Sequence, residues 1–158
     1  GVHLVRIAEA LQFFESPAHR MRLVPGIKEA LIIDDAYNAS PLSMESAFDA
    51  VRHLTATRKV GILGDMLELG AYAMDAHKKI GELAADVFDL LITVGPRGRL
   101  IAESAKEHGL GARKIYSFDT VDEALVKIPD LVKKGDLILI KASRALALDR
   151  ASHALKTA

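Results

Sequence analysis

Short runs of mostly apolar residues alternate with longer amphipathic stretches along most of the chain. Each run is four or five residues long and is bounded by polar or turn residues, as strands buried inside a sheet are. The predicted strands are residues 30–33, 59–63, 90–94, 114–118 and 137–140. Between them, apolar residues recur at helical spacing, which predicts helices over residues 40–54, 75–87, 99–107, 120–127 and 146–156.

This repeated order of strand and helix predicts an α/β fold. Parallel strands joined through helices form right-handed crossovers, so we expect a mostly parallel sheet with helices on both faces. Residues 2–14 carry a separate helical pattern that Pro17 ends, and residues 19–24 alternate weakly before the turn signal at Pro25-Gly26. The regular alternation begins after that turn.

Composition argues against several classes of partner. Lys plus Arg and Asp plus Glu both total 21, so the chain lacks the basic excess typical of binding to nucleic acid or to an anionic membrane. No apolar run approaches the about 20 residues that span a bilayer. The absence of cysteine excludes disulfides and thiolate metal sites and fits a cytoplasmic protein. The chain begins with Gly1 rather than methionine, and we expect it to be part of a longer protein.

Polar segments directly follow the predicted strands. Ligands of open parallel sheets bind beyond the carboxyl ends of the strands, which makes these segments the candidate site. They are residues 34–41, 64–70, 95–97 and 141–144. Each also has a plain interpretation: Asp34 and Asp35 as acids that end a strand and cap the following turn, with Asp35 exposed, the glycines as turn residues, and Lys141 and Arg144 as solvated surface charges.

Two common phosphate-binding loops are missing. The sequence has no Gly-x-x-x-x-Gly-Lys-Ser/Thr loop and no Gly-x-Gly-x-x-Gly after the first strand, so a Rossmann-like topology is expected here without a dinucleotide fingerprint. The six histidines show no metal-ligand spacing, and we expect them to be surface residues or hydrogen-bonded core residues. From the residues alone, the prediction is an α/β domain with a polar cleft.

Three motifs resemble those of the Mur ligase family. They are residues 33–44 (IDDAYNASPLSM), residues 63–70 (LGDMLELG) followed by His77 and Gly81, and residues 135–144 (GDLILIKASR). The resemblance is closest to the members that add D-alanyl-D-alanine to a UDP-N-acetylmuramoyl tripeptide. Ser40 stands where that group usually has Asn, and Ala142 and Ala145 stand where it usually has Gly.

The resemblance implies a domain organisation and a reaction. Residues 1–17 would be the tail of a central ATPase domain, and residues 18–158 the C-terminal domain. In such ligases ATP phosphorylates the peptide carboxylate of the precursor, and the amine of the dipeptide attacks the acyl phosphate. ATP would be the cofactor, with Mg²⁺ bound mainly by the central domain. The partners would be the UDP-N-acetylmuramoyl peptide, D-alanyl-D-alanine and the other two domains of the same chain, and this fragment alone would be inactive.

The resemblance also implies roles for individual residues. Arg20 would reach the ATP phosphates, and Asp35 would accept hydrogen bonds from the ribose hydroxyls. Tyr37 and Asn38 would lie beside the nucleotide. The substrate-binding residues would be Lys141, Ser143 and Arg144, and no catalytic residue or metal ligand is assigned. We further expect the connector from Pro17 to Pro25 to be a hinge, with Arg20 free to move when ATP is absent.

Two other classes of function compete with this interpretation. A response-regulator receiver, which accepts phosphate on an aspartate, also carries paired acids, a later acid, a hydroxyl residue and a lysine, and here the set would be Asp34, Asp35, Asp65, Thr93 and Lys141. That lysine is normally followed by proline, whereas Ala142 follows it here. The other alternative is a non-catalytic interaction domain.

Overall fold

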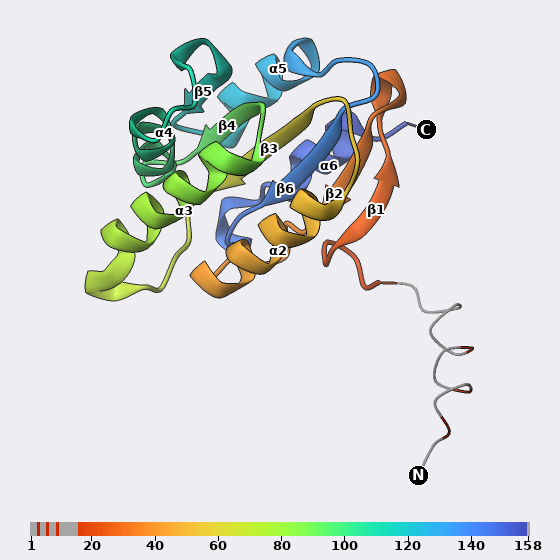
Figure 1. Ribbon diagram of the computed structural model, residues 1–158, viewed down its shortest axis with the longest axis horizontal. Coiled ribbons are helices and arrows are strands. Elements are labelled where there is room, and N and C mark those ends of the chain that lie inside the picture. The colour runs from red at the N-terminus through yellow and green to blue at the C-terminus, as the bar shows by residue number, and fades with distance from the viewer. Residues whose placement is uncertain (1–2, 4–5, 7–8, 10–15, 158) are drawn as a thin grey trace.

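The computed structural model describes residues 3, 6, 9 and 16–157 (Figure 1). The helix expected over residues 2–14 falls mainly outside these residues. The strands are β1 (Arg22–Pro25), β2 (Leu31–Asp34), β3 (Lys59–Gly64), β4 (Leu90–Val94), β5 (Ile115–Phe118) and β6 (Leu137–Lys141). The helices are α2 (Pro41–His53), α3 (Ala73–Val87), α4 (Gly98–Glu107), α5 (Val121–Leu131) and α6 (Asp149–Leu155).

The six strands form one sheet in the order β1-β2-β6-β3-β4-β5. Only β1 runs antiparallel, and the other neighbours pair in parallel, which confirms the mostly parallel sheet. The edge strand β1 begins at Arg22, within the weakly alternating stretch of residues 19–24, and a turn occupies residues 19–21. The chain then turns through Lys28 and Glu29, whose φ angles of 54° and 58° reverse its direction into β2.

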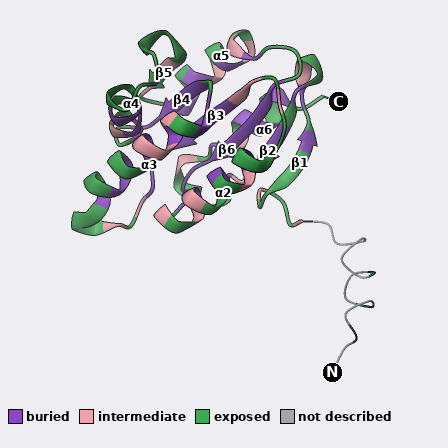
Figure 2. Ribbon diagram, viewed as in Figure 1, coloured by how far each residue is buried: buried purple, intermediate pink, exposed green. Residues whose placement is uncertain are grey.

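Helices cover both faces of the sheet, as predicted (Figure 2). Side chains alternate along each strand, so Ile32 packs with one core and Ile33 with the other. The first core includes residues of α5 and α6, and the second includes residues of α2, α3 and α4. Within the described part of the chain, no helix is both long enough and apolar enough to cross a membrane.

Several element ends differ from the predicted ones. Helix α5 continues past Pro129 to Leu131 instead of ending near Lys127, because Ile128 is buried and draws the last turn onto the sheet. A short 3-10 turn over Arg144–Leu146, followed by Ala147 at a φ of 52°, delays α6 to Asp149. Both corrections come from packing and backbone geometry that helical spacing does not encode.

The order of connections creates a crevice at the carboxyl end of β2 and β6. These strands are parallel neighbours, but β2 continues into α2 on one face and β6 continues toward α6 on the other. The chain therefore leaves the two strand ends in opposite directions and opens a gap between them, which is where open α/β sheets bind ligands.

Candidate functional site

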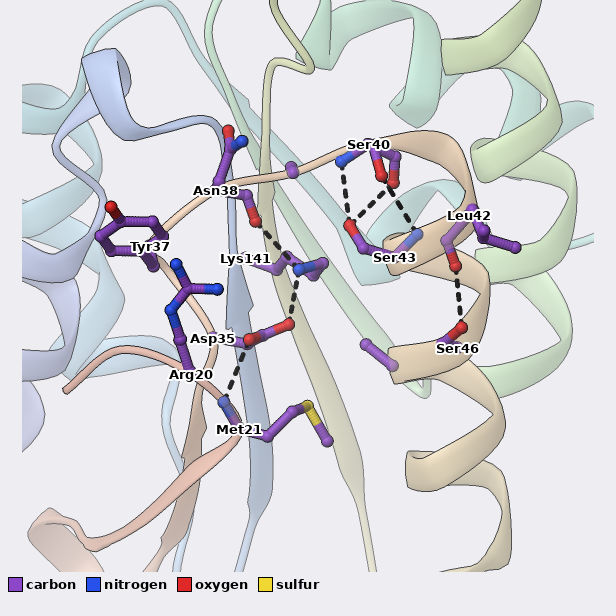
Figure 3. Close-up of a pocket in the computed structure, with 12 residues that line it drawn as sticks. Arg20, Met21, Asp35, Tyr37, Asn38, Ser40, Leu42, Ser43, Ser46 and Lys141 are labelled. Atoms are coloured by element: carbon purple, nitrogen blue, oxygen red, sulfur yellow. Dashed lines mark hydrogen bonds and ion pairs between the residues drawn. The ribbon is translucent and has the colours of Figure 1, made fainter. Parts of the chain in front are cut away.

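An open pocket of about 540 Å³ occupies this crevice (Figure 3). Its walls come from the segment before β1, the β2–α2 loop, the start of α2 and the end of β6. The lining residues are Arg20, Met21, Asp35, Tyr37, Asn38, Ala39, Ser40, Leu42, Ser43, Ser46, Ala47 and Lys141. All four residues expected to bind ATP, which are Arg20, Asp35, Tyr37 and Asn38, line this one pocket.

An ion pair between Asp35 and Lys141 forms the floor of the pocket. Nζ of Lys141 lies 2.5 Å from Oδ2 of Asp35 and also donates to the backbone oxygen of Asn38 at 3.0 Å. The side chains of Lys141 and Asp35 are only 3% and 13% exposed. The expectations of an exposed Asp35 and of a solvated Lys141 are therefore wrong, because β6 lies beside β2 and brings the ammonium group to the carboxylate.

Two guanidinium groups approach the ring of Tyr37. The guanidinium carbon of Arg20 lies 3.9 Å from the ring centroid and that of Arg144 lies 5.5 Å from it. Both distances are within the range of cation–π attraction. Within the described part of the chain, neither guanidinium has a carboxylate at salt-bridge distance. Two positively charged groups therefore lie beside the ring of Tyr37, and an anionic ligand can neutralise their charge.

Arg20 lies in a segment with several contacts to the β2–α2 loop. The backbone N–H of Met21 donates to Oδ1 of Asp35 at 3.0 Å, and that of Tyr37 donates to the backbone oxygen of His19 at 3.0 Å. Arg20 is therefore placed against Tyr37 by hydrogen-bonded neighbours in this structure, and its expected freedom to move without ATP stays a prediction.

A second pocket, of about 550 Å³, shares Tyr37 and Asn38 with the first. It is also lined by Ser143, Arg144 and residues 67–69 of the β3–α3 loop. The hydroxyl of Ser143 accepts a hydrogen bond from the backbone N–H of Leu67 at 2.8 Å and so ties β6 to that loop. The three residues expected to bind substrate are thus divided, with Lys141 in the first pocket and the other two in the second.

The receiver interpretation does not survive the geometry of Asp65. A phosphoacceptor carboxylate must be accessible, but Asp65 is only 2% exposed and its Oδ1 accepts the backbone N–H of Gly98 at 2.7 Å. Gly95 has a φ of 100°, and a Cβ at this position would lie 2.5 Å from the same carboxylate oxygen. Asp65 therefore holds the loop between β4 and α4.

His77 is a hydrogen-bonded core residue, as expected for a histidine without metal-ligand spacing. Its Nε2 accepts the backbone N–H of Met66 at 2.9 Å, while Nδ1 lies 2.6 Å from the backbone oxygen of Ala73. Burial lowers the pKa of His77 below its usual 6.5, against the opposing hydrogen bond to Ala73. No group of three or more acidic, histidine or cysteine residues suited to a metal ion occurs in the described part of the chain.

The three departures from the family motifs fit their positions. Ser40 caps α2: its hydroxyl accepts the backbone N–H of Ser43 at 3.3 Å, and the hydroxyl of Ser43 accepts the backbone N–H of Ser40 at 2.9 Å. Neither Ala142 nor Ala145 is among the described residues with positive φ, so alanine is compatible with the backbone at both positions.

Sequence reasoning missed the contacts of His19 and the pairing of Lys141 with Asp35. Nδ1 of His19 lies 2.8 Å from Oδ2 of Asp34. Both contacts join segments far apart in the chain and depend on the strand order. The motifs mark the residues of such contacts without showing which of them meet.

The model of the family described as "Mur ligase, glutamate ligase domain" matches residues 19–144. The UDP-N-acetylmuramoyl-tripeptide–D-alanyl-D-alanine ligase of Bacillus subtilis is 35% identical over 144 residues, covering 90% of this chain and 31% of that protein. The ligase of the same name from Treponema pallidum is 35% identical over 159 residues, covering 99% of this chain and 34% of that protein. The chain therefore spans about a third of the length of these relatives.

Solved structures of similar sequence share the fold. A MurF crystal structure from Acinetobacter baumannii has a TM-score of 0.82 at 28% identity and covers 97% of this chain and 34% of its own. MurF ligase from Thermotoga maritima, solved in complex with ADP, has a TM-score of 0.74 at 25% identity and covers 95% of this chain and 35% of its own. The family model matches most of the chain, and the pocket carries the family's motif residues. This chain therefore belongs to the Mur ligase family and corresponds to the C-terminal, glutamate ligase domain of its members.

Proposed function

We propose that this chain is the C-terminal domain of an ATP-dependent ligase that joins D-alanyl-D-alanine to a UDP-N-acetylmuramoyl tripeptide in peptidoglycan synthesis. The observation that carries the proposal is the pocket at the ends of β2 and β6, which collects Arg20, Asp35, Tyr37 and Asn38 in one place. Relatives that carry this enzyme's name match nearly the whole chain. ATP and UDP-linked precursors are cytoplasmic metabolites, so the proposed reaction is cytoplasmic.

The chemistry of the first pocket fits a nucleotide. Tyr37 offers an aromatic face, Asp35 offers carboxylate oxygens for ribose hydroxyls, and the guanidinium of Arg20 suits phosphate oxygens. The related Thermotoga maritima protein was solved with ADP. Because this sequence has no phosphate-binding loop, we assign the β- and γ-phosphates and Mg²⁺ mainly to the central domain of the full-length protein.

The second pocket fits the incoming dipeptide. Arg144 supplies a cation without a carboxylate partner among the described residues, and it suits the carboxylate of D-alanyl-D-alanine. Ser143 keeps the β3–α3 loop beside it. We group Lys141 with the nucleotide residues, because its charge is neutralised by Asp35. Since Tyr37 and Asn38 line both pockets, the two ligands would lie next to each other.

In this arrangement the domain contributes position and charge. Residues of the first pocket hold the nucleotide, and those of the second orient the dipeptide amine toward the phosphorylated peptide carboxylate. Closure against the central domain would exclude water from that reactive group. The N-terminal domain of the same chain would hold the UDP-linked precursor.

The test is a ligation assay with the full-length protein. Phosphate release should require the UDP-linked tripeptide, ATP and D-alanyl-D-alanine together, and mass spectrometry should detect the pentapeptide product. Arg144→Ala should raise the KM for D-alanyl-D-alanine by roughly tenfold, as expected for loss of one charged hydrogen bond. Phosphate release that does not depend on the dipeptide would contradict the proposal.

A further inference from the structure

Residues 19–21, the segment that carries Arg20, contact a carboxylate on each side of Arg20. Nδ1 of His19 lies 2.8 Å from Oδ2 of Asp34, and the backbone N–H of Met21 donates to Oδ1 of Asp35 at 3.0 Å. Asp34 is the last residue of β2 and Asp35 follows it; Asp34 lines a small pocket beside α6, whereas Asp35 lines the pocket beside α2. Residues 19–21 therefore cross the end of the strand with Arg20 between the two attachments.

The backbone on either side of Arg20 has an uncommon conformation. His19 has a φ of 60° and Met21 a φ of 48°, in the left-handed region that non-glycine residues seldom adopt. Such a conformation persists where the surroundings hold it in place. Here the surroundings are the hydrogen bonds to the two carboxylates and the bond from the backbone N–H of Tyr37 to the oxygen of His19. The stacking of Arg20 on Tyr37 depends on this path of the chain.

The contact between His19 and Asp34 lies outside the proposed nucleotide pocket. Both residues line a smaller pocket that also includes Ser152 and His153 of α6. The side chain of Asp34 is 4% exposed, that of His19 is 19% exposed, and the ring of His153 lies 5.7 Å from that of His19. Neither His19 nor Asp34 lines the pocket of Arg20 and Tyr37. The imidazole of His19 would therefore act on a nucleotide through the backbone of residues 19–21, whereas Asp34 also accepts the backbone N–H of Ala36 in the β2–α2 loop at 3.3 Å.

We propose that His19 and Asp34 are positioning residues that hold Arg20 over Tyr37 before the nucleotide binds. The proposal rests on the proposed function, in which Arg20 contacts the phosphates. A guanidinium that is already in place loses less conformational freedom when it meets its ligand. Without the contact between His19 and Asp34, residues 19–21 keep the hydrogen bonds of Met21 and Tyr37 but lose the contact of the His19 side chain with a carboxylate.

The test is a double-mutant cycle in the full-length ligase. His19→Gly removes the imidazole and suits the positive φ, so it separates the contact from backbone strain. We expect His19→Gly to lower kcat/KM for ATP by roughly tenfold, as loss of position at a reactive site does. In an Arg20→Ala background the same change should cost less than about twofold, because a residue that acts through Arg20 has nothing left to position. Asp34→Asn should reproduce the loss and add little to it in the His19→Gly protein.

The matched control is His153→Ala, which removes the neighbouring imidazole of the same small pocket and should leave kcat/KM for ATP unchanged. Equal losses from His19→Gly with and without Arg20 would overturn the proposal, since the histidine would then act on the fold alone. If Arg20→Ala lowers kcat/KM but His19→Gly does not, only this proposal fails. If Arg20→Ala itself has no effect, the role of Arg20 in the proposed function fails as well.

Discussion

The pair formed by Asp35 and Lys141 shows how one contact changes the expected effect of a mutation. Truncating Asp35 to alanine would leave the nearly buried ammonium group of Lys141 without its charge partner, and breaking such a pair costs about 3–5 kcal/mol of stability. Asparagine keeps an oxygen that accepts a hydrogen bond. Asp35→Asn still removes the charge partner, but it leaves the ammonium group a hydrogen-bond acceptor and so disturbs the fold less than Asp35→Ala does.

We expect Asp35→Asn to raise the KM for ATP of the full-length protein by roughly tenfold. A hydrogen bond to a charged group contributes about 1.5–3 kcal/mol, and each ~1.4 kcal/mol corresponds to one decade. Steady-state kinetics with ATP as the varied substrate measures it. Asp49→Asn, in an exposed pair with Arg52 on α2, is the control and should change nothing. An unchanged KM in a folded Asp35→Asn protein would remove Asp35 from the nucleotide site.

His77 predicts how the stability of this domain depends on pH. Burial lowers its pKa in the folded state, so the unfolded chain binds the proton more readily. The stabilising contribution of neutral His77 is therefore present above its usual pKa of 6.5 and is lost as the pH falls below that value toward the folded-state pKa. Protonation of Nε2 would also break its hydrogen bond with the backbone N–H of Met66.

The melting temperature should therefore fall between pH 7.5 and pH 5.5, and by less in a His77→Gln variant. Thermal unfolding at several pH values measures both slopes. His53→Gln is a control, because that imidazole is exposed on α2. Equal slopes for the wild type and His77→Gln would show that other groups cause the acid sensitivity.

At the scale of elements, one helix pair depends on the absence of a single side chain. Helices α3 and α4 approach so closely at Gly81 that a Cβ there would lie 2.4 Å from the backbone oxygen of Ile101 and 2.7 Å from Cβ of Ser104. Alanine has a better helix propensity than glycine by about 1 kcal/mol, which favours the substitution. The backbone contact opposes it and must push the helices apart.

We expect the contact to dominate, so Gly81→Ala should lower the free energy of unfolding by roughly 1–3 kcal/mol, the usual cost of overpacking. Denaturant unfolding of the fragment measures it. Gly98→Ala, at the start of α4, is the matched control, because its nearest contact would be an ordinary 3.4 Å to Cβ of Thr93. A Gly81→Ala protein as stable as the Gly98→Ala protein would contradict the expected clash.

The sequence predicted the elements better than their ends. Apolar runs identified every parallel strand, and β3, β4 and β6 are almost entirely buried, as such runs predict, whereas the edge strand β5 is only partly buried. The edge strand β1 has only a weak pattern, since one side of it faces solvent and its pairing depends on the reversal at Lys28 and Glu29. The motif residues of the candidate site were identified in the same way, but their partners depend on strand order, which no local pattern records.

For the whole molecule, the proposed function divides the nucleotide site between this domain and others. The pocket holds groups suited to a base, a ribose and one phosphate contact, while no loop in this sequence can surround the β- and γ-phosphates. We therefore expect the purified fragment to release no phosphate from ATP, with or without D-alanyl-D-alanine. A malachite-green assay measures this release, with the full-length ligase as the positive control. Catalytic turnover of ATP by the fragment would contradict a divided site.

Arg20 connects the stability of the fragment to the activity of the whole enzyme. In the fragment it stacks on Tyr37 at an exposed position, and such a cation–π contact contributes about 0.5–1 kcal/mol. Arg20→Ala should therefore shift the melting temperature of the fragment by only a few degrees. In the full-length protein the same change removes a charge proposed to meet phosphate oxygens, so turnover should fall by at least roughly tenfold. Lys156→Ala, another exposed cation on the same domain, should leave both values unchanged. A large loss of fragment stability with normal turnover would instead make Arg20 a structural residue.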